Sequence, residues 1–141
     1  MIKKILHPGV YPQNLDAALL VLRIASGVLM LTHGVGKIAL FGTEPIQFYD
    51  PIGLGAAASL TLAVFAEVFC AIFLILGIGT RFAAVTLLTT MLVAALIFHA
   101  NDPFVKQELP LLYATCFLVL AITGAGKFSI DNFLFNRIKL K

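Results

Sequence analysis

The sequence predicts an all-α integral membrane protein: a four-helix bundle with its two termini on the same side of the membrane. Hydrophobic residues make up 60% of the chain and the mean hydropathy is +1.01, whereas soluble domains are about 45–50% apolar. Four apolar stretches approach the roughly 20 residues that a membrane-spanning helix needs. The connections between them are short, so residues 1–141 are expected to form a single membrane domain.

The predicted spans cover residues 16–41, 56–78, 82–99 and 109–125. Asn14 and Asp16 suit the start of the first span, because Asn and Asp side chains cap the free amides of a helix N-terminus. The connection 42–55 contains two Pro and three Gly and is the longest loop, and long loops are more often functional. Residues 77–81 predict a tight turn between antiparallel neighbours, and Pro110 fits the first turn of the fourth span.

Both ends of the chain are expected at the membrane surface. Residues 1–14 form a surface arm, because Pro8, Gly9 and Pro12 interrupt any apolar core of a signal peptide. In residues 127–141 apolar and basic side chains alternate, which is typical of an amphipathic helix that lies in the membrane interface.

The basic residues predict the orientation of the bundle. Four spans place both termini and the 77–81 turn on one side, which carries seven of the ten Lys and Arg residues: Lys3, Lys4, Arg81, Lys127, Arg137, Lys139 and Lys141. Basic residues are retained in the cytoplasm. Both termini are therefore expected in the cytoplasm of a multi-pass inner-membrane protein, with loops 42–55 and 100–108 facing outward.

Six ionisable residues lie inside the predicted spans or at their rims: Arg23, His33, Lys37, Glu67, His99 and Glu108. A charge inside a bilayer costs on the order of 2.5–3.5 kcal/mol on insertion scales, so such residues face the bundle interior, pair with one another and mark functional sites. The helical rise places Glu67 at the midplane of the second span, with the other residues except Arg23 nearer the outer face.

Five of these residues form the predicted ligand-binding site: His33, Lys37, Glu67, His99 and Glu108. Spacings of four, three and four residues place one stripe on the first span: Ser26, Met30, His33 and Lys37. Arg23 lies inward of this level and is predicted to form a structural ion pair with Glu67. Two other interpretations stay open: Arg23 and Lys37 reach lipid headgroups with their long side chains, or His33 and Glu67 only order two packed helices.

No catalytic residue and no metal site is predicted. Two His and two carboxylates are ligand types for Zn or Fe, but no helix carries a paired HxxxH or ExxH motif. Haem ligation by His33 and His99 would need both at one depth, and they differ by most of two helical turns. Cys70 and Cys116 lie in separate spans, without the CxxC spacing of a thiol relay.

Four segments of the chain carry a family likeness. Residues 22–42 read LRIASGVLMLTHGVGKIALFG, and residues 63–84 read AVFAEVFCAIFLILGIGTRFAA. The third span ends in His99, and residues 124–133 read GAGKFSIDNF. In their order and spacing these segments resemble the DoxX family of small four-helix bacterial membrane proteins. The resemblance implies the following matching polar positions: Arg23, His33, Lys37, Glu67, Arg81 and His99.

The resemblance implies a membrane subunit of, or accessory to, a quinone-linked redox system. Some relatives are linked to quinol oxidases, thiosulfate–quinone oxidoreduction or redox-defence complexes, often as accessory subunits. An apolar cleft with His33, Lys37 and Glu67 suits a quinone, because quinone carbonyls accept hydrogen bonds and a buried carboxyl can move protons. Quinone is therefore the candidate cofactor, and the expected partners are membrane lipid and other membrane redox subunits rather than nucleic acid. Whether the chain is itself an enzyme stays open.

The alternative is a non-enzymatic assembly or helper protein that packs against partner membrane proteins. Small residues let helices approach closely in a membrane, and the second span carries a set of alanines: Ala56, Ala57, Ala58, Ala63, Ala66 and Ala71. A transporter or proton pathway is a third interpretation, and four spans without repeats or broken helices argue against it.

Overall fold

A computed structural model of the protein describes residues 12–139, and every regular element in that range is helical. The first span is α2 (Pro12–Ile38), which continues into a 3₁₀ turn, η1 (Ala39–Gly42). The second comprises α3 (Ala56–Val64), a π-helical turn η2 (Phe65–Cys70) and α4 (Ala71–Leu76). The third comprises α5 (Thr80–Val93) and a second π-helical turn, η3 (Ala94–Phe98). The fourth is α6 (Phe104–Thr123), followed by the short α7 (Ile130–Lys139).

The four-span prediction is confirmed within the described residues. Four helical segments are long and apolar enough to cross a membrane: Asn14–Gly42, Ala56–Leu76, Thr80–Phe98 and Phe104–Thr123. Their outer surfaces carry large apolar side chains, for example Val21 at 67% exposed and Ile122 at 68%. A surface of this kind matches the hydrocarbon of a bilayer, so the protein is an integral membrane protein.

The start of the fourth span was predicted wrongly. The helix begins at Phe104, five residues before the predicted start, and Pro103 takes the capping position. Pro110 therefore lies inside α6 rather than in its first turn. Proline has no amide hydrogen, so the carbonyl of Lys106 loses the donor that a regular helix would supply. The predicted surface arm, residues 1–14, lies outside the described residues except for Pro12 to Asn14, which begin α2.

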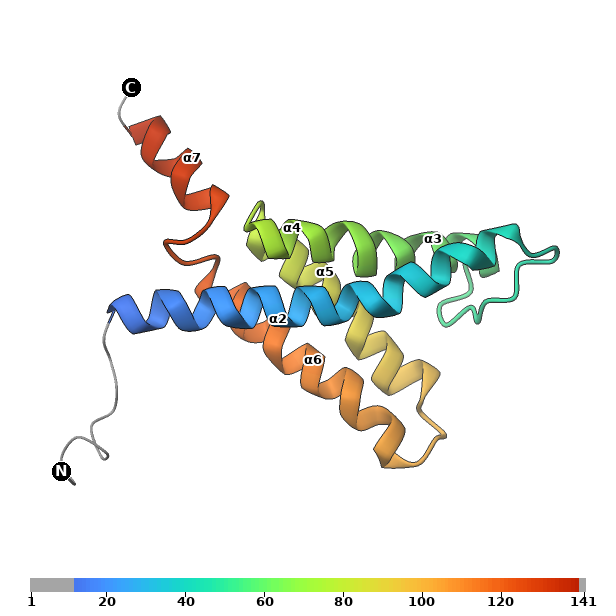
Figure 1. Ribbon diagram of the computed structural model, residues 1–141. Coiled ribbons are helices and arrows are strands. Elements are labelled where there is room, and N and C mark those ends of the chain that lie inside the picture. Colours follow the sequence, from blue (N-terminus) through green and yellow to red (C-terminus); the bar gives the residue numbers. More distant parts are fainter. Residues whose placement is uncertain (1–11, 140–141) are drawn as a thin grey trace.

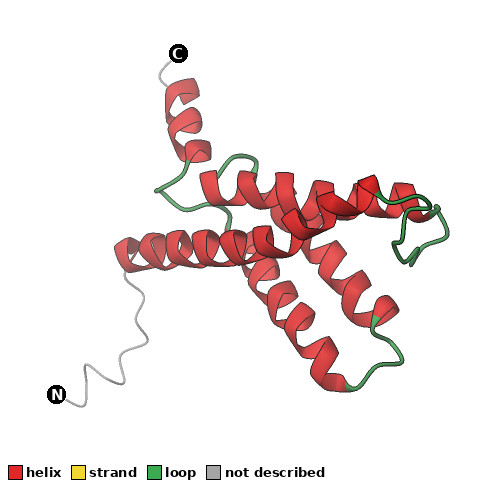
Figure 2. Cartoon of the chain, turned by 45° about the vertical axis from the view of Figure 1, so that its right-hand side comes forward, coloured by secondary structure: helices red, strands yellow, loops and turns green. Residues whose placement is uncertain are grey.

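The spans form two hairpins that separate toward one end. Figures 1 and 2 show α3 and α4 running beside α2, while α5 and α6 cross this pair and diverge from it toward the loop that joins them. We call this the loop end, because it holds residues 43–55 and 99–103. At the opposite end, which we call the tail end, α7 projects away from the bundle (Figure 1).

Two glycines bring α2 against the second span. A Cβ added to Gly27 would lie 2.6 Å from Ile75 Cγ1, and one added to Gly34 would lie 2.8 Å from backbone and side-chain atoms of Glu67. Only a residue without a side chain fits at such distances. The remaining core is apolar and includes the fully buried Leu74, Leu87 and Phe117, and it fixes how the four spans pack.

The segment after α6 ties the tail end together. The Arg23 guanidinium is 1% exposed and donates hydrogen bonds to the carbonyls of Ala125 and Phe128. The Asp16 carboxylate accepts a hydrogen bond from the Lys127 amide at 3.0 Å and pairs with the Lys127 ammonium at 3.3 Å. The family-like GAGKFSIDNF segment therefore docks onto α2 through its backbone.

Asp131 joins the same segment to the α4–α5 turn. Its carboxylate accepts hydrogen bonds from the amides of Gly79 at 2.8 Å and Thr80 at 3.0 Å. Its own amide donates to the Gly77 carbonyl at 2.8 Å. A carboxylate at this position caps the free amides of α5 and complements the helix dipole. We refer to the contacts of Arg23, Asp16 and Asp131 together as the tail clasp.

Candidate functional site

A cavity of about 230 Å³ lies between the two hairpins, toward the loop end. It is lined by residues of all four spans: Met30, His33, Lys37, Glu67, Met91, Ala94, Phe98, His99, Lys106, Leu109, Pro110 and Tyr113. The wall is mainly apolar and carries a few polar side chains. This composition is typical of small-molecule sites, in which apolar area supplies affinity and polar groups fix orientation.

An ion pair between α2 and η2 forms part of the cavity wall. The Lys37 ammonium donates to both carboxylate oxygens of Glu67. The Glu67 side chain is 3% exposed and that of Lys37 is 30% exposed. A buried carboxylate is stable only when it is paired, so Lys37 supplies the counter-charge that keeps Glu67 at this depth.

The backbone around Glu67 is unusual. Glu67 lies in the π-helical turn η2, which packs against Gly34 of α2. The second π-helical turn, η3, ends directly before His99. Single π turns inside α-helices occur frequently at functional sites. Sequence reasoning did not find either turn, because an extra residue in a helical turn leaves no mark in the hydrophobic pattern.

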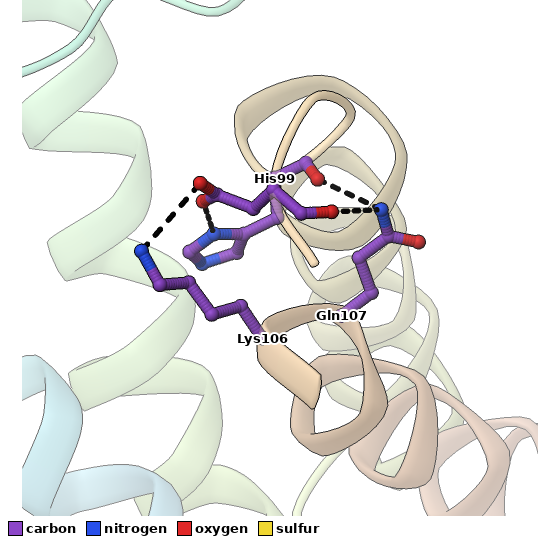
Figure 3. A network of polar contacts seen from close by, with 4 residues as sticks. His99, Lys106 and Gln107 are labelled. Atoms are coloured by element: carbon purple, nitrogen blue, oxygen red, sulfur yellow. Dashed lines mark hydrogen bonds and ion pairs between the residues drawn. The ribbon is translucent and has the colours of Figure 1, made fainter. Parts of the chain in front are cut away.

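His99 is fixed at the loop end of the cavity by a polar network (Figure 3). Its Nδ1 lies 2.7 Å from Asp102 Oδ2, and its carbonyl accepts a hydrogen bond from Gln107 Nε2 at 2.8 Å. The hydrogen bond from His99 holds the pKa of Asp102 below its usual range, and Lys106 acts in the same direction. Because an ionised carboxylate only accepts, Nδ1 carries the hydrogen, which leaves Nε2 as the ring nitrogen available to a ligand.

His33 and Tyr113 face each other across the cavity wall. Their ring centroids lie 5.9 Å apart in an edge-to-face arrangement, and Tyr113 also stacks on Phe117 with ring centroids 5.9 Å apart. His33 is exposed, whereas Tyr113 is 9% exposed. His33 therefore marks the place where the cavity opens to the surface of the bundle.

The structure brings together four of the five residues predicted to bind a ligand. His33, Lys37, Glu67 and His99 all line the cavity. Glu108 lies on an exposed position of α6 and is not part of the wall. Glu108 lies outside the wall because of its position around α6: Lys106, Leu109 and Pro110 occupy the face of this helix that lies toward the cavity.

The predicted ion pair between Arg23 and Glu67 is not formed. Arg23 lies beside Gly77, with Nη1 at 2.9 Å from the position of an added Cβ, whereas Glu67 lies beside Gly34. Eleven residues of α2 separate Arg23 from Gly34, or roughly 16 Å along the helix. The partner of Glu67 is Lys37, and Arg23 belongs to the tail clasp.

The predicted polar stripe of α2 lies toward the cavity, since Met30, His33 and Lys37 all line it. Ser26 and Met30 are buried as expected, but the buried face continues through Gly34, and His33 lies at its edge. Each step of four residues turns by about 40° around a helix, so the buried face of α2 runs past His33 to Gly34. Within the described residues, no group of three or more His, Cys, Asp or Glu side chains is placed to hold a metal ion.

Comparisons with known proteins identify similar sequences. The family profile described as DoxX matches residues 18–100. The chain is 33% identical over 127 residues to the inner membrane protein YqjF of Escherichia coli, covering 84% of this chain and 93% of that protein. It is 32% identical over 123 residues to an uncharacterised protein of Haemophilus influenzae, covering 82% and 90% of the two chains. No solved structure matches the sequence significantly.

Proposed function

We propose a function for this chain, which belongs to the DoxX family of integral membrane proteins: it binds a quinone in the cavity between its hairpins, as a subunit of or accessory to a quinone-linked redox system. The observation that supports the proposal is the Lys37–Glu67 pair in the wall of a mainly apolar cavity. The similarity to an inner membrane protein of Escherichia coli supports the inner membrane as its location.

The size of the cavity suits a ring with a lipid-exposed chain. At about 230 Å³ it is smaller than the roughly 300–1,000 Å³ of sites that enclose a drug-sized ligand. It therefore has room for a headgroup but not for an isoprenoid chain. The exposed position of His33 leaves the site open to the surrounding lipid, where such a chain would lie.

The polar groups suit the two redox forms of a quinone. The Lys37 ammonium donates to a carbonyl oxygen, and the Glu67 carboxylate accepts from a quinol hydroxyl. His99 Nε2 adds a group that can accept or donate according to its protonation. The cavity thus offers both kinds of hydrogen bond to a ligand that changes from acceptor to donor on reduction.

The test is the quinone content and quinone-dependent stability of the purified protein. We expect His33→Ala to lose bound quinone but still to fold. Without quinone its unfolding temperature should stay near that of quinone-free wild type, because within the described residues His33 has no hydrogen bond and its one ring contact is with Tyr113. Glu108→Gln is the matched control, since Glu108 lies outside the cavity wall, and it should retain wild-type quinone content.

A wild-type protein that neither carries quinone nor is stabilised by it would refute the proposal. The non-enzymatic helper function would then take its place. In that function, not all six alanines of the second span can contact a partner, because Ala66 and Ala71 are buried inside this chain. Of the six alanines, Ala57 and Ala58 lie at exposed positions where they can contact a partner protein.

A further inference from the structure

Tyr113 is a buried polar side chain that the structure leaves without a hydrogen bond. It is 9% exposed and lines the cavity. Its contacts are the two ring contacts with His33 and Phe117, and its hydroxyl has no hydrogen-bond partner in the described part of the chain. The hydroxyl is not fully enclosed, because the enclosed side-chain polar atoms without a partner in the described residues are Arg23 Nε and Thr80 Oγ1. Tyr113 thus carries an accessible, unpaired hydroxyl on a residue that lines the cavity, and a tyrosine hydroxyl in an apolar setting normally finds a hydrogen-bond partner.

The ring of Tyr113 is held in place from several directions. Phe117 stacks against one face at an interplanar angle of 19°, and His33 meets it at 86°. Pro110 lies one helical turn earlier on α6 and lines the same cavity. A side chain fixed by such packing loses little conformational entropy when it binds a ligand, which favours it as a preorganised contact.

We infer that the Tyr113 hydroxyl is a ligand-binding group that recognises an oxygen substituent on the ring of the bound molecule. This inference rests on the proposed quinone site and adds a residue to it. A phenol both donates and accepts hydrogen bonds, so Tyr113 donates to a quinone carbonyl and accepts from a quinol hydroxyl. Together with the Lys37–Glu67 pair, it allows the cavity to hold the oxidised and the reduced forms of one carrier.

The experiment compares Tyr113→Phe with wild type in binding a short-chain ubiquinone and its quinol in lipid nanodiscs. We expect the dissociation constants of both forms to rise about threefold to tenfold, the range for loss of one neutral hydrogen bond. The unfolding temperature without ligand should not fall, because the lost hydroxyl had no partner in the protein. Tyr49→Phe is the control: Tyr49 contacts Phe98 at 5.1 Å but does not line the cavity, and it should bind as wild type does.

The outcomes separate this inference from the proposed function. If wild type and Tyr113→Phe bind both forms equally, the hydroxyl contacts at most water, and the inference alone is wrong. If Tyr113→Phe weakens only one form, the claim that it serves both redox states is wrong. If wild type binds neither form, the quinone function fails, and the role of Tyr113 fails with it.

Discussion

At the scale of single residues, the central feature is an ion pair at the wall of a cavity inside the bundle. Glu67 is 2% exposed, and both of its oxygens accept from Lys37. A buried pair of this kind stabilises a fold weakly in net terms, because the desolvation of both charges offsets their attraction. A pair that contributes little net stability and lines a cavity is better explained by function than by folding.

The first prediction concerns this pair. Lys37→Met should leave the Glu67 carboxylate uncompensated and lower the free energy of unfolding by up to about 3 kcal/mol, the low end of the range for buried pairs. The low end applies because the Lys37 side chain is 30% exposed. Combining Lys37→Met with Glu67→Gln should recover most of the loss. The measurement is chemical or thermal unfolding in one detergent.

Two comparisons make that prediction specific. Lys106→Met removes an exposed lysine of the same cavity wall and should cost little, since exposed ion pairs contribute about 0–1 kcal/mol. Arg23→Leu combined with Glu67→Leu should show no compensation, because these residues are not partners. Recovery in the Arg23 combination, or its absence in the Lys37 combination, would contradict the pairing in the structure.

At the scale of elements, α2 and the π-helical turn η2 pack so closely that a glycine is required between them. Gly34 faces the backbone of Glu67, and the π turn directs the Glu67 carboxylate toward Lys37 of α2. The geometry of the ion pair therefore depends on helix packing, and the cavity depends on both.

The second prediction tests this packing. Gly34→Ala places a Cβ 2.8 Å from Glu67 atoms, and the forced separation should lower the free energy of unfolding by about 1–3 kcal/mol. It should also weaken quinone binding by displacing Glu67. Gly36→Ala, in the same helix, meets no atom within 4 Å and should be neutral or stabilising through helix propensity. Equal unfolding temperatures for the two variants would show that α2 and η2 are not in close contact.

The loop before α3 has its own anchor in Asp50. The carboxylate accepts hydrogen bonds from the Ser59 hydroxyl at 2.7 Å and from the amides of Gly55 at 2.6 Å and Leu54 at 3.1 Å. These bonds, first that of Ser59 and then that of Gly55, hold the pKa of Asp50 below its usual range. Asp50 thus connects the longest loop to the start of the second span.

The third prediction follows from the sign of that pKa shift. A carboxylate with a lowered pKa in the folded state adds stability above its unfolded pKa of about 3.9, and this stability is lost as the pH falls through the folded value. Asp50→Asn should therefore lower the unfolding temperature at pH 7, and this effect should shrink progressively as the pH falls below about 3.9. Glu44→Gln, in the same loop and exposed, is the control and should show no such difference. A pH-independent effect of Asp50→Asn would rule out the ionised carboxylate as the anchor.

At the scale of the whole molecule, hydropathy was enough to predict the four spans, and the cost of buried charge pointed to four of the residues that line the cavity: His33, Lys37, Glu67 and His99. The predictions failed for contacts that depend on how a helix is rotated about its axis and how far it is shifted along its neighbour. Distance along a helix placed Arg23 near Glu67, whereas the packing of Gly27 and Gly34 fixes a register that puts Arg23 beside Gly77. Tyr113 was missed as a site residue because a tyrosine in an apolar span is also typical of a membrane interface.

The tail clasp explains why the GAGKFSIDNF segment belongs to the fold. Arg23 and Asp131 connect the residues after α6 to the first span and to the α4–α5 turn. The start of α2, this turn and the segment 124–131 consequently meet at one end of the bundle, opposite the loops 43–55 and 99–103 (Figure 1). Within the described residues the two ends differ in charge: the tail end carries Arg81, Lys127 and Arg137, and the loop end carries Glu44, Asp50, Asp102 and Glu108.

The last prediction is the orientation of these two ends. The sequence predicts seven of the ten Lys and Arg residues on the side of the tail end, and basic segments next to spans stay in the cytoplasm. The test introduces Gln47→Cys in the long loop or Asn136→Cys in α7, both at exposed positions, in a background that lacks Cys70 and Cys116. A membrane-impermeant maleimide added to intact spheroplasts should label the first variant only, and permeabilised cells should show labelling of both. Labelling of Asn136→Cys alone would reverse the orientation, and labelling of both in intact cells would be incompatible with the four-span arrangement.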